Sequence, residues 1–405
     1  MKIYSLTLLV CLFAFLSVSA AEPSWPFFHG PKGDNISTET GLLTSWPEGG
    51  PKLLWKTGEL GAGNAGFAGV AIVDGKIYTS GNVTEGDDTY STVFCLDAKN
   101  GETLWTYKNG PAWTDARMHP GTRSTPTIDG DYVYDETPLG QLACLDKNTG
   151  KMIWTKNILA DFEAKNITWA LAESVVIDGD NLICTPGGDK ASVVALNKKT
   201  GDVVWTAPSV GQLTNYATPY IFEFEGWRII AAMTQKGGIG VDAKTGALLF
   251  QFTHETSYDI NATSPYYFDG HLFITSGYGT GSQLLKLSKD GDGVKVEQVW
   301  ENKAFDNQHH GIVVIEGHVY GATHNYKRGI WACLRLSDGE IVWEDPGVGK
   351  GSCTCAEGLI YGICEGDGTV GIFKATPEKY EEVGRFQLPE EGEGMYWAHP
   401  VVCGK

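Results

Sequence analysis

Polar side chains of several chemical kinds recur in the segments that lead into the first apolar run of each sequence repeat. They are Arg117, His119, Arg123, Trp169, Glu173, Asn215, Asn261, His309, His310, Trp397 and His399. Guanidinium groups bind anions, carboxylates and amides bind hard cations, and indoles stack on flat ligands. Connections with a purely structural role would not need this variety, so we predict that these residues converge on one ligand pocket.

Each group also has a structural interpretation that stays open. Arg117 and Arg123 could bind an anion or form salt bridges between repeats. Glu173 precedes an apolar run, where a buried carboxylate needs a cation or a metal ion as its partner. His309 and His310 are adjacent, so in an extended segment their side chains point opposite ways and at most one faces the pocket. No cluster of metal ligands is evident, and no metal site is predicted.

The elements that must position these residues are short apolar runs, and residues 124–154 contain one full set of four. Glycine-bearing turns at Gly130 and Gly150 separate them, and the last run ends at Trp154. Four short strands with such turns describe one antiparallel sheet. A single sheet of this kind is marginally stable, and repeating it along the chain lets neighbouring sheets cover both of its faces.

The set recurs eight times. The first turn falls at residues 74–75, 129–130, 178–179, 225–226, 269–270, 316–317, 357–358 and 403–404, and the closing aromatic at Trp55, Trp105, Trp154, Trp205, Phe250, Trp300, Trp343 and Phe386. We therefore predict an all-β, eight-bladed β-propeller of four-stranded antiparallel blades, with residues 52–56 in the same blade as Val401 and Val402. The closing blade is incomplete at Lys405: either about 15–20 residues are missing or the ring is weakly closed.

Three segments are distinguished along the chain. Residues 1–20 combine Lys2, an apolar stretch and a small-residue end, which predicts a cleaved signal peptide; an uncleaved anchor helix and lipidation at Cys11 are the alternatives. Residues 21–51 predict an extended strap over the surface, and residues 52–405 the propeller. The expected anchors of the strap are Trp25, Phe27, Phe28 and Trp46. After cleavage no transmembrane segment is expected, which predicts a periplasmic or extracellular protein.

Charge and cysteine usage limit the partners and the cross-links. A formal net charge of −18 argues against nucleic acid and favours neutral or cationic ligands. Eight cysteines remain beyond the signal sequence. Cys353, Cys355 and Cys364 lie near one predicted turn, where free buried thiols, a disulfide of Cys353 with either neighbour, and a metal site are the alternatives.

The turn pattern Leu-Asp-x-x-Thr-Gly-x-x-x-Trp at 145–154, with variants at 96–105 and 196–205, resembles the repeat of PQQ-like (pyrroloquinoline-quinone-like) β-propellers. The resemblance covers about residues 52–405. That family includes quinoprotein alcohol dehydrogenases and the non-enzymatic lipoprotein of the outer-membrane β-barrel assembly machine. Further segments resemble secreted bacterial PQQ-like repeat proteins of obscure role; these are residues 169–174, 277–281, 309–311 and 397–400.

The resemblance implies two functions from different classes. The first is a non-catalytic binding or scaffold protein that takes a small molecule or a protein at a polar central funnel. The alternative is a dehydrogenase that oxidises an alcohol or a sugar with PQQ and Ca²⁺. For the enzyme, the resemblance implies stacking by Trp169 or Trp397, quinone binding by Arg117 or Arg123, and Ca²⁺ binding by Glu173 with Asn215 or Asn261. Because Glu173 would have to be both metal ligand and base, the binding function is favoured.

Overall fold

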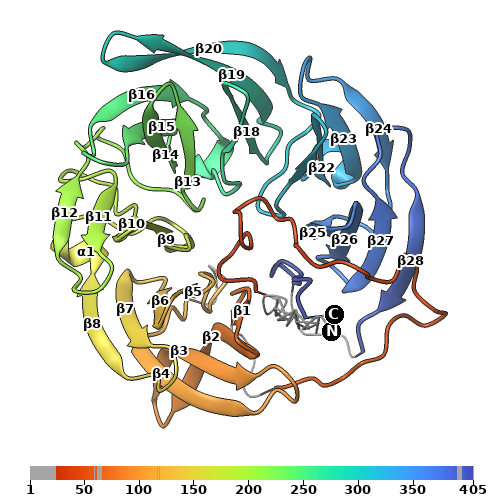
Figure 1. The fold of residues 1–405 in the computed structure, drawn as a ribbon, viewed down its shortest axis with the longest axis horizontal. Coiled ribbons are helices and arrows are strands. Elements are labelled where there is room, and N and C mark those ends of the chain that lie inside the picture. The colour runs from red at the N-terminus through yellow and green to blue at the C-terminus, as the bar shows by residue number, and fades with distance from the viewer. Residues whose placement is uncertain are drawn as a thin grey trace, which may run out of the picture.

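The computed structural model describes residues 24–58, 60–61, 66–115, 117, 119–389 and 395–404. The predicted signal peptide, residues 1–20, lies outside these ranges. Within them, no helix has the length and apolar character needed to cross a membrane. The described chain forms a ring of antiparallel sheets arranged around a central axis (Figure 1), so the all-β propeller class predicted from the repeats is confirmed.

Seven four-stranded sheets, each a meander of consecutive strands, make up the described part of the ring. The first three sheets are β1 (Ala71–Val73), β2 (Lys76–Glu85), β3 (Asp88–Asp97) and β4 (Thr103–Pro111); β5 (Thr127–Asp129), β6 (Tyr132–Glu136), β7 (Gln141–Asp146) and β8 (Met152–Asn157); and β9 (Val176–Asp178), β10 (Asn181–Cys184), β11 (Val194–Asn197) and β12 (Val203–Thr206). The fourth and fifth are β13 (Tyr220–Phe224), β14 (Trp227–Thr234), β15 (Gly237–Asp242) and β16 (Leu248–Thr253); and β17 (Tyr266–Phe268), β18 (His271–Ser276), β19 (Gly281–Asp290) and β20 (Gly293–Asn302). The last two are β21 (Val313–Ile315), β22 (His318–Ala322), β23 (Trp331–Arg335) and β24 (Ile341–Asp345); and β25 (Gly351–Ala356), β26 (Leu359–Cys364), β27 (Thr369–Lys374) and β28 (Glu382–Gln387). Three single turns of helix are α1 (Ile158–Asp161), η2 (Ser257–Asp259) and η3 (Tyr326–Arg328).

The turns and the closing aromatic residues lie at the positions that the sequence repeat predicts. The hairpin between β1 and β2 turns through Asp74 and Gly75, whose φ angles of 52° and 68° suit a two-residue turn that follows the twist of the strands. The closing indole of each of several sheets donates to a carbonyl in the turn of the next sheet. The donors are Trp105, Trp154, Trp205, Trp300 and Trp343, at N–O distances of 2.8–3.1 Å. These tryptophans therefore join neighbouring sheets.

Trp55 makes the same contact on the first sheet without belonging to a strand. Its Nε1 donates to the carbonyl of Ala98 at 2.9 Å, as the other closing indoles do to the sheets that follow them. Its place is thus that of the last strand of a blade before β1, which is consistent with an eighth position in the ring. The predicted blade that would hold residues 52–56 together with Val401 and Val402 is not formed, because neither segment is a strand. In a four-stranded blade the first and fourth strands are not neighbours, and only the two middle strands connect them by hydrogen bonds.

The N-terminal strap closes the ring instead. Trp25 exchanges two backbone hydrogen bonds of 2.7 Å with Ile72 of β1, and Ile36 forms a parallel bridge with Cys355 of β25. Ser37 donates its hydroxyl to the carbonyl of Val402 at 2.6 Å, which fixes the C-terminal segment to the strap. Trp25, one of the predicted anchors, is only 1% exposed, and the strap crosses the centre of the ring (Figure 1). Bridging the first and last sheets satisfies edges that would otherwise be free.

The eight described cysteines are free thiols. For Cys353, Cys355 and Cys364, free thiols were one of the three predicted alternatives. Cys353 and Cys355 are fully buried in the core between β22 and β25, together with Trp331 and Phe373. Burial raises the pKa of both thiols, Cys355 to about 12, so they are protonated at neutral pH. They act as small apolar side chains rather than as a cross-link.

Candidate functional site

A cavity of about 420 Å³ lies where the connecting segments meet the strap. Six of the residues predicted for a common pocket line it: His119, Arg123, Trp169, His309, Trp397 and His399. The other lining residues are Phe28, Phe67, Ala172, Tyr216, Ile260, Ala262, Tyr278, Gln308, His324, Lys350, Glu365, Met395 and Ala398. The size suits a small molecule, and aromatic rings form much of the wall. The structure therefore brings about half of the predicted residues together.

Glu365 carries the most concentrated set of polar contacts in this cavity. It follows β26 directly, and its Oε1 forms an ion pair with Nζ of Lys350 at a distance of 2.5 Å. Its Oε2 accepts hydrogen bonds from Nε1 of Trp397 and Nε2 of His310, both at 3.0 Å. Burial of this carboxyl raises its pKa, but the hydrogen bonds from His310 and Lys350 and the positive charge of Lys350 outweigh burial and hold the pKa at about 2. Glu365 is therefore an anion at neutral pH.

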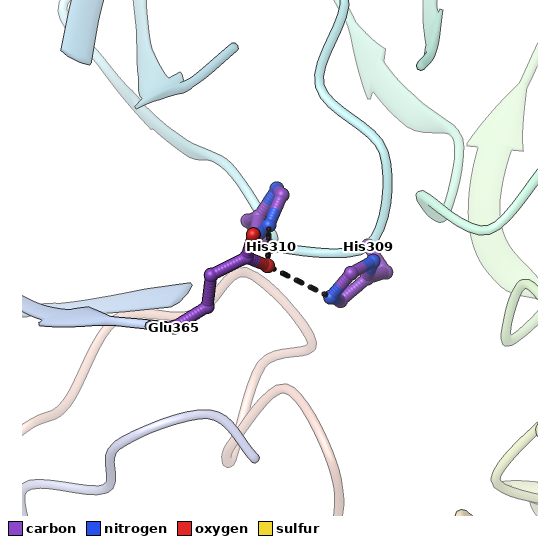
Figure 2. Close-up of side chains that lie close together, drawn as sticks. All are labelled: His309, His310 and Glu365. Carbon is purple, nitrogen blue, oxygen red and sulfur yellow. Dashed lines mark hydrogen bonds and ion pairs between the residues drawn. The ribbon is translucent and has the colours of Figure 1, made fainter. Parts of the chain in front are cut away.

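His309 and His310 both approach that carboxylate. Figure 2 shows the two imidazoles directed at Glu365 from the segment that precedes β21. Their ring centroids are 4.2 Å apart, and Nε2 of His309 lies 3.9 Å from Oε2 of Glu365. The two side chains do not point opposite ways, as predicted for an extended segment, because residues 309 and 310 form a bend. Only His309 lines the cavity. Burial, as the largest cause, lowers the pKa of both histidines, so both rings are neutral at pH 7.

Five of the predicted residues do not line the cavity. Arg117 is an exposed side chain paired with Asp115, at 3.1 Å between Nη2 and Oδ2. Asn215 and Asn261 are fully buried and bind backbone: the amide of each donates to the carbonyl of Thr234. Their side-chain oxygens accept hydrogen bonds as well, Asn215 from the backbone N–H of Asn261 and Asn261 from the hydroxyl of Ser276. The two amides therefore stabilise the connecting segments. The remaining two, His310 and Glu173, are buried and do not line the cavity.

Glu173 belongs to a second, closed group of carboxyls. Its two oxygens accept from the backbone N–H and the hydroxyl of Thr185, at 2.7 and 2.5 Å. Glu136, at the end of β6, is 2% exposed and neither of its oxygens has a hydrogen-bond partner. Burial raises the pKa of both carboxyls, and their mutual repulsion raises that of Glu136 further. The cation predicted as the partner of Glu173 is absent from its contacts, which are with Thr185.

Sequence reasoning missed Glu365, His324 and Tyr278 because it considered only the segments between blades, and it also passed over Lys350, which lies in such a segment directly before β25. Glu365, His324 and Tyr278 lie one or two residues after the second strand of their sheets, β26, β22 and β18. The turns that follow the second strands thus reach the same face of the ring as the connecting segments. A signal was present in the sequence, since these positions hold different polar residues in different repeats. Phe28 was named as an anchor of the strap, but not as part of the pocket.

Comparison with known proteins agrees with this architecture. A family model described as outer membrane protein assembly factor BamB matches residues 89–345, well over half of the chain. Among solved structures, quinohemoprotein alcohol dehydrogenase from Comamonas testosteroni superposes with a TM-score of 0.61 at 12% identity, covering 95% of this chain and 75% of that one. BamB from Moraxella catarrhalis superposes with a TM-score of 0.54 at 17% identity, covering 77% and 83%. At such identities the structural matches establish the fold alone.

Curated relatives match a shorter stretch. A quinoprotein ethanol dehydrogenase of Pseudomonas aeruginosa is 33% identical over 147 residues, which is 34% of this chain and 22% of the relative. Quinoprotein alcohol dehydrogenase PedH of Pseudomonas putida is 29% identical over 151 residues, again 34% of this chain and 22% of the relative. The chain thus matches about a fifth of the length of these enzymes.

Proposed function

The chain belongs to the PQQ-like β-propeller family that the BamB model describes, and on that premise we propose that it is an exported, non-catalytic binding protein that holds a small molecule in its axial cavity. The observation that carries the proposal is the cavity of about 420 Å³ formed by seven sheets, the strap and the C-terminal segment. A pocket lined by aromatic rings with a few charged groups at one side is typical of small-molecule sites. A protein partner would need a broad surface rather than a concave pocket.

The walls favour a ligand with a flat face and a hydrogen-bonding edge. Trp169 and Trp397 offer aromatic surfaces, and the ring centroid of Trp397 lies 4.7 Å from that of Phe67 and 4.9 Å from that of His119. Glu365 and Lys350 supply an acceptor and a donor in the same wall. Such a combination binds a sugar or a heteroaromatic ring through stacking and edge contacts.

The alternative, a PQQ- and Ca²⁺-dependent dehydrogenase, lacks support from the residues assigned to it. Glu173, Asn215 and Asn261 were assigned to Ca²⁺, but their oxygens accept hydrogen bonds within the fold and do not face the cavity. Ca²⁺ needs six to eight oxygen ligands that converge on one point. Of the residues assigned to the quinone, Trp169, Trp397 and Arg123 line the cavity, and Arg117 does not. The residues present do not fit the predicted Ca²⁺ site.

The test is to identify what the native protein carries. Full-length protein is isolated from the envelope or culture fluid of its own source, unfolded, and its released small molecules are compared by mass spectrometry with those from Trp397→Ala. We expect a compound that is present in the wild type and lost in the variant. Trp227→Ala, on β14 and remote from the cavity, is the matched control and should retain it. Equal recovery from Trp397→Ala and the wild type would contradict the proposal.

Titration with PQQ separates the two functions. Submicromolar PQQ binding that requires Ca²⁺, is abolished by Glu173→Ala and accompanies dye-linked alcohol oxidation would support the enzyme and overturn the binding protein.

Export of the protein is tested by a separate measurement. The proposal predicts that the protein recovered outside the cytoplasm begins at Ala21, as intact mass measurement would establish.

A further inference from the structure

We propose that His309, His310 and Glu365 bind a divalent first-row transition metal ion in the wall of the axial cavity. One nitrogen of each imidazole and one carboxylate oxygen lie within 4.8 Å of one another (Figure 2). The proposal goes beyond the binding function, because it concerns these three side chains and holds whatever molecule fills the cavity.

The distances between the ligand atoms are close to those of a metal centre. With metal–ligand bonds of about 2.1 Å, neighbouring ligands lie about 3.0–3.4 Å apart in octahedral or tetrahedral geometry. The separation of Nε2 of His310 from Oε2 of Glu365 is 3.0 Å, already in this range. Nε2 of His309 is 3.9 Å from the same oxygen and would have to approach by about 0.5 Å. The ligand nitrogens of the two imidazoles lie within 4.8 Å of each other and would also have to draw closer, which rotation of the His309 ring allows.

One ligand atom has no other role in the fold. Nε2 of His309 is buried and makes no hydrogen bond, although buried polar atoms are nearly always paired. A cation bound between this nitrogen and Glu365 would satisfy it. To bind the same ion, His310 would carry its proton on Nδ1 instead of Nε2, since a neutral imidazole binds a metal through its unprotonated nitrogen. The three side chains thus form a site at the cost of one existing hydrogen bond.

Neighbouring residues fix the carboxylate. Nζ of Lys350 binds Oε1 of Glu365, and Nε1 of Trp397 binds Oε2, so the side chain is held with Oε2 turned toward both histidines. Outer contacts of this kind orient metal ligands and raise affinity. Lys350 occupies the other oxygen, and Oε2, which accepts from Trp397, has a lone pair for a metal ion once His310 no longer donates to it.

The ligand set indicates the class of metal. Two imidazoles and one carboxylate favour Zn²⁺, Co²⁺, Cu²⁺ or Fe²⁺ over Ca²⁺ and Mg²⁺, which prefer oxygen ligands alone. Three protein ligands leave coordination positions free, and because His309 and Glu365 both line the cavity, those positions face it. Water or an electron-rich group of a cavity ligand would complete the shell.

The experiment uses the whole mature protein without a histidine tag, stripped with a chelator and titrated with Co²⁺ and with Zn²⁺. We expect one equivalent of Co²⁺ to give the visible absorption of a low-coordinate nitrogen and oxygen site, and Zn²⁺ to displace it. His309→Gln and Glu365→Gln should each weaken Zn²⁺ binding by at least about 100-fold in calorimetry. His309→Gln removes no hydrogen bond of Nε2, so its fold should persist, as circular dichroism would verify.

His324→Gln is the matched control. This histidine lines the same cavity, and its ring centroid is 6.4 Å from that of His310, but it does not belong to the ligand group. It should change Zn²⁺ affinity by less than about threefold. Absence of stoichiometric binding, or equal losses in His324→Gln and His309→Gln, would overturn the proposal.

Discussion

Two groups of buried carboxyls near the axis of the ring have opposite electrostatic character. Glu365 has a lysine, an indole N–H and an imidazole within 3.0 Å, and its pKa lies at about 2. Burial raises the pKa of both Glu136 and Glu173, and the charges of Glu173 and Asp135 raise that of Glu136 further. The first group lines the cavity and the second is closed off from it.

The difference shows that a carboxyl at the axis is not by itself evidence of a binding site. Glu173 was chosen from the sequence because it precedes an apolar run, yet the hydroxyl of Thr185 meets it instead of a cation. Glu365 was passed over, yet it meets Lys350. Whether a buried acid is charged depends on the cations that other segments bring to it.

The largest test of this contrast removes the cation. Lys350→Met should lower the free energy of unfolding by about 2–4 kcal/mol, because it leaves Glu365 charged and largely buried without its ion pair. Urea unfolding at pH 7, with a chelator present, measures the loss. Lys108→Met, which breaks the exposed pair with Glu85, is the control and should cost less than about 0.5 kcal/mol. Similar losses of unfolding free energy in Lys350→Met and Lys108→Met would show that the buried ion pair of Glu365 contributes no more than an exposed one.

The next test neutralises the closed group. Because burial and the neighbouring Glu173 raise the pKa of Glu136 above 4.5, the folded protein binds a proton more tightly than the unfolded chain does. The contribution of Glu136 to stability is therefore fully present at pH 4 and is lost as the pH rises through its raised pKa. Glu136→Gln should add about 1–2 kcal/mol at pH 8 and nothing at pH 4. Urea unfolding between pH 4 and pH 8 measures this change in the free energy of unfolding, and Glu102→Gln at an exposed position is the control. A lower stability of Glu136→Gln than of the wild type at pH 8 would contradict the prediction.

A smaller effect should come from the donor to Glu173. Thr185→Val removes the hydroxyl that binds Oε2 and should destabilise the fold by about 1 kcal/mol at pH 8, where the carboxyl carries the most charge. The effect should shrink toward pH 4. Thr84→Val, which removes an exposed hydroxyl pair with Thr89, provides the comparison. Thermal unfolding at the two pH values would detect a loss that is independent of pH, which would argue against a role for the charge.

The smallest effect concerns the indole beside Glu365. Trp397→Phe keeps an aromatic ring near His309 and loses only the N–H donor, so we expect about 0.5–1 kcal/mol of destabilisation. Because Lys350 and His310 remain, Glu365 should stay ionised. Unfolding in urea measures the change, and a loss as large as that of Lys350→Met would assign the indole a dominant role in holding the carboxylate.

The sequence by itself determined the strands, the turns and the joints between sheets. Alternating apolar runs, the positive φ of Gly75 and the indoles that reach the next turn are properties of residues close together in one repeat. The length of the repeat then sets a propeller. His119, Arg123 and Trp397 could also be assigned to the cavity, because they lie in segments that every propeller directs toward its axis.

Only the tertiary structure decided how the ring closes and which polar groups meet. Trp25 pairs with Ile72, Ile36 with Cys355, and His310 with Glu365, and no local pattern specifies any of these contacts. The bend at His309 and His310, which turns two adjacent rings to one carboxylate, likewise depends on the neighbours that hold it. The physical reason is that strand and turn preferences act over a few residues, whereas charge state and coordination depend on atoms brought together from distant parts of the chain.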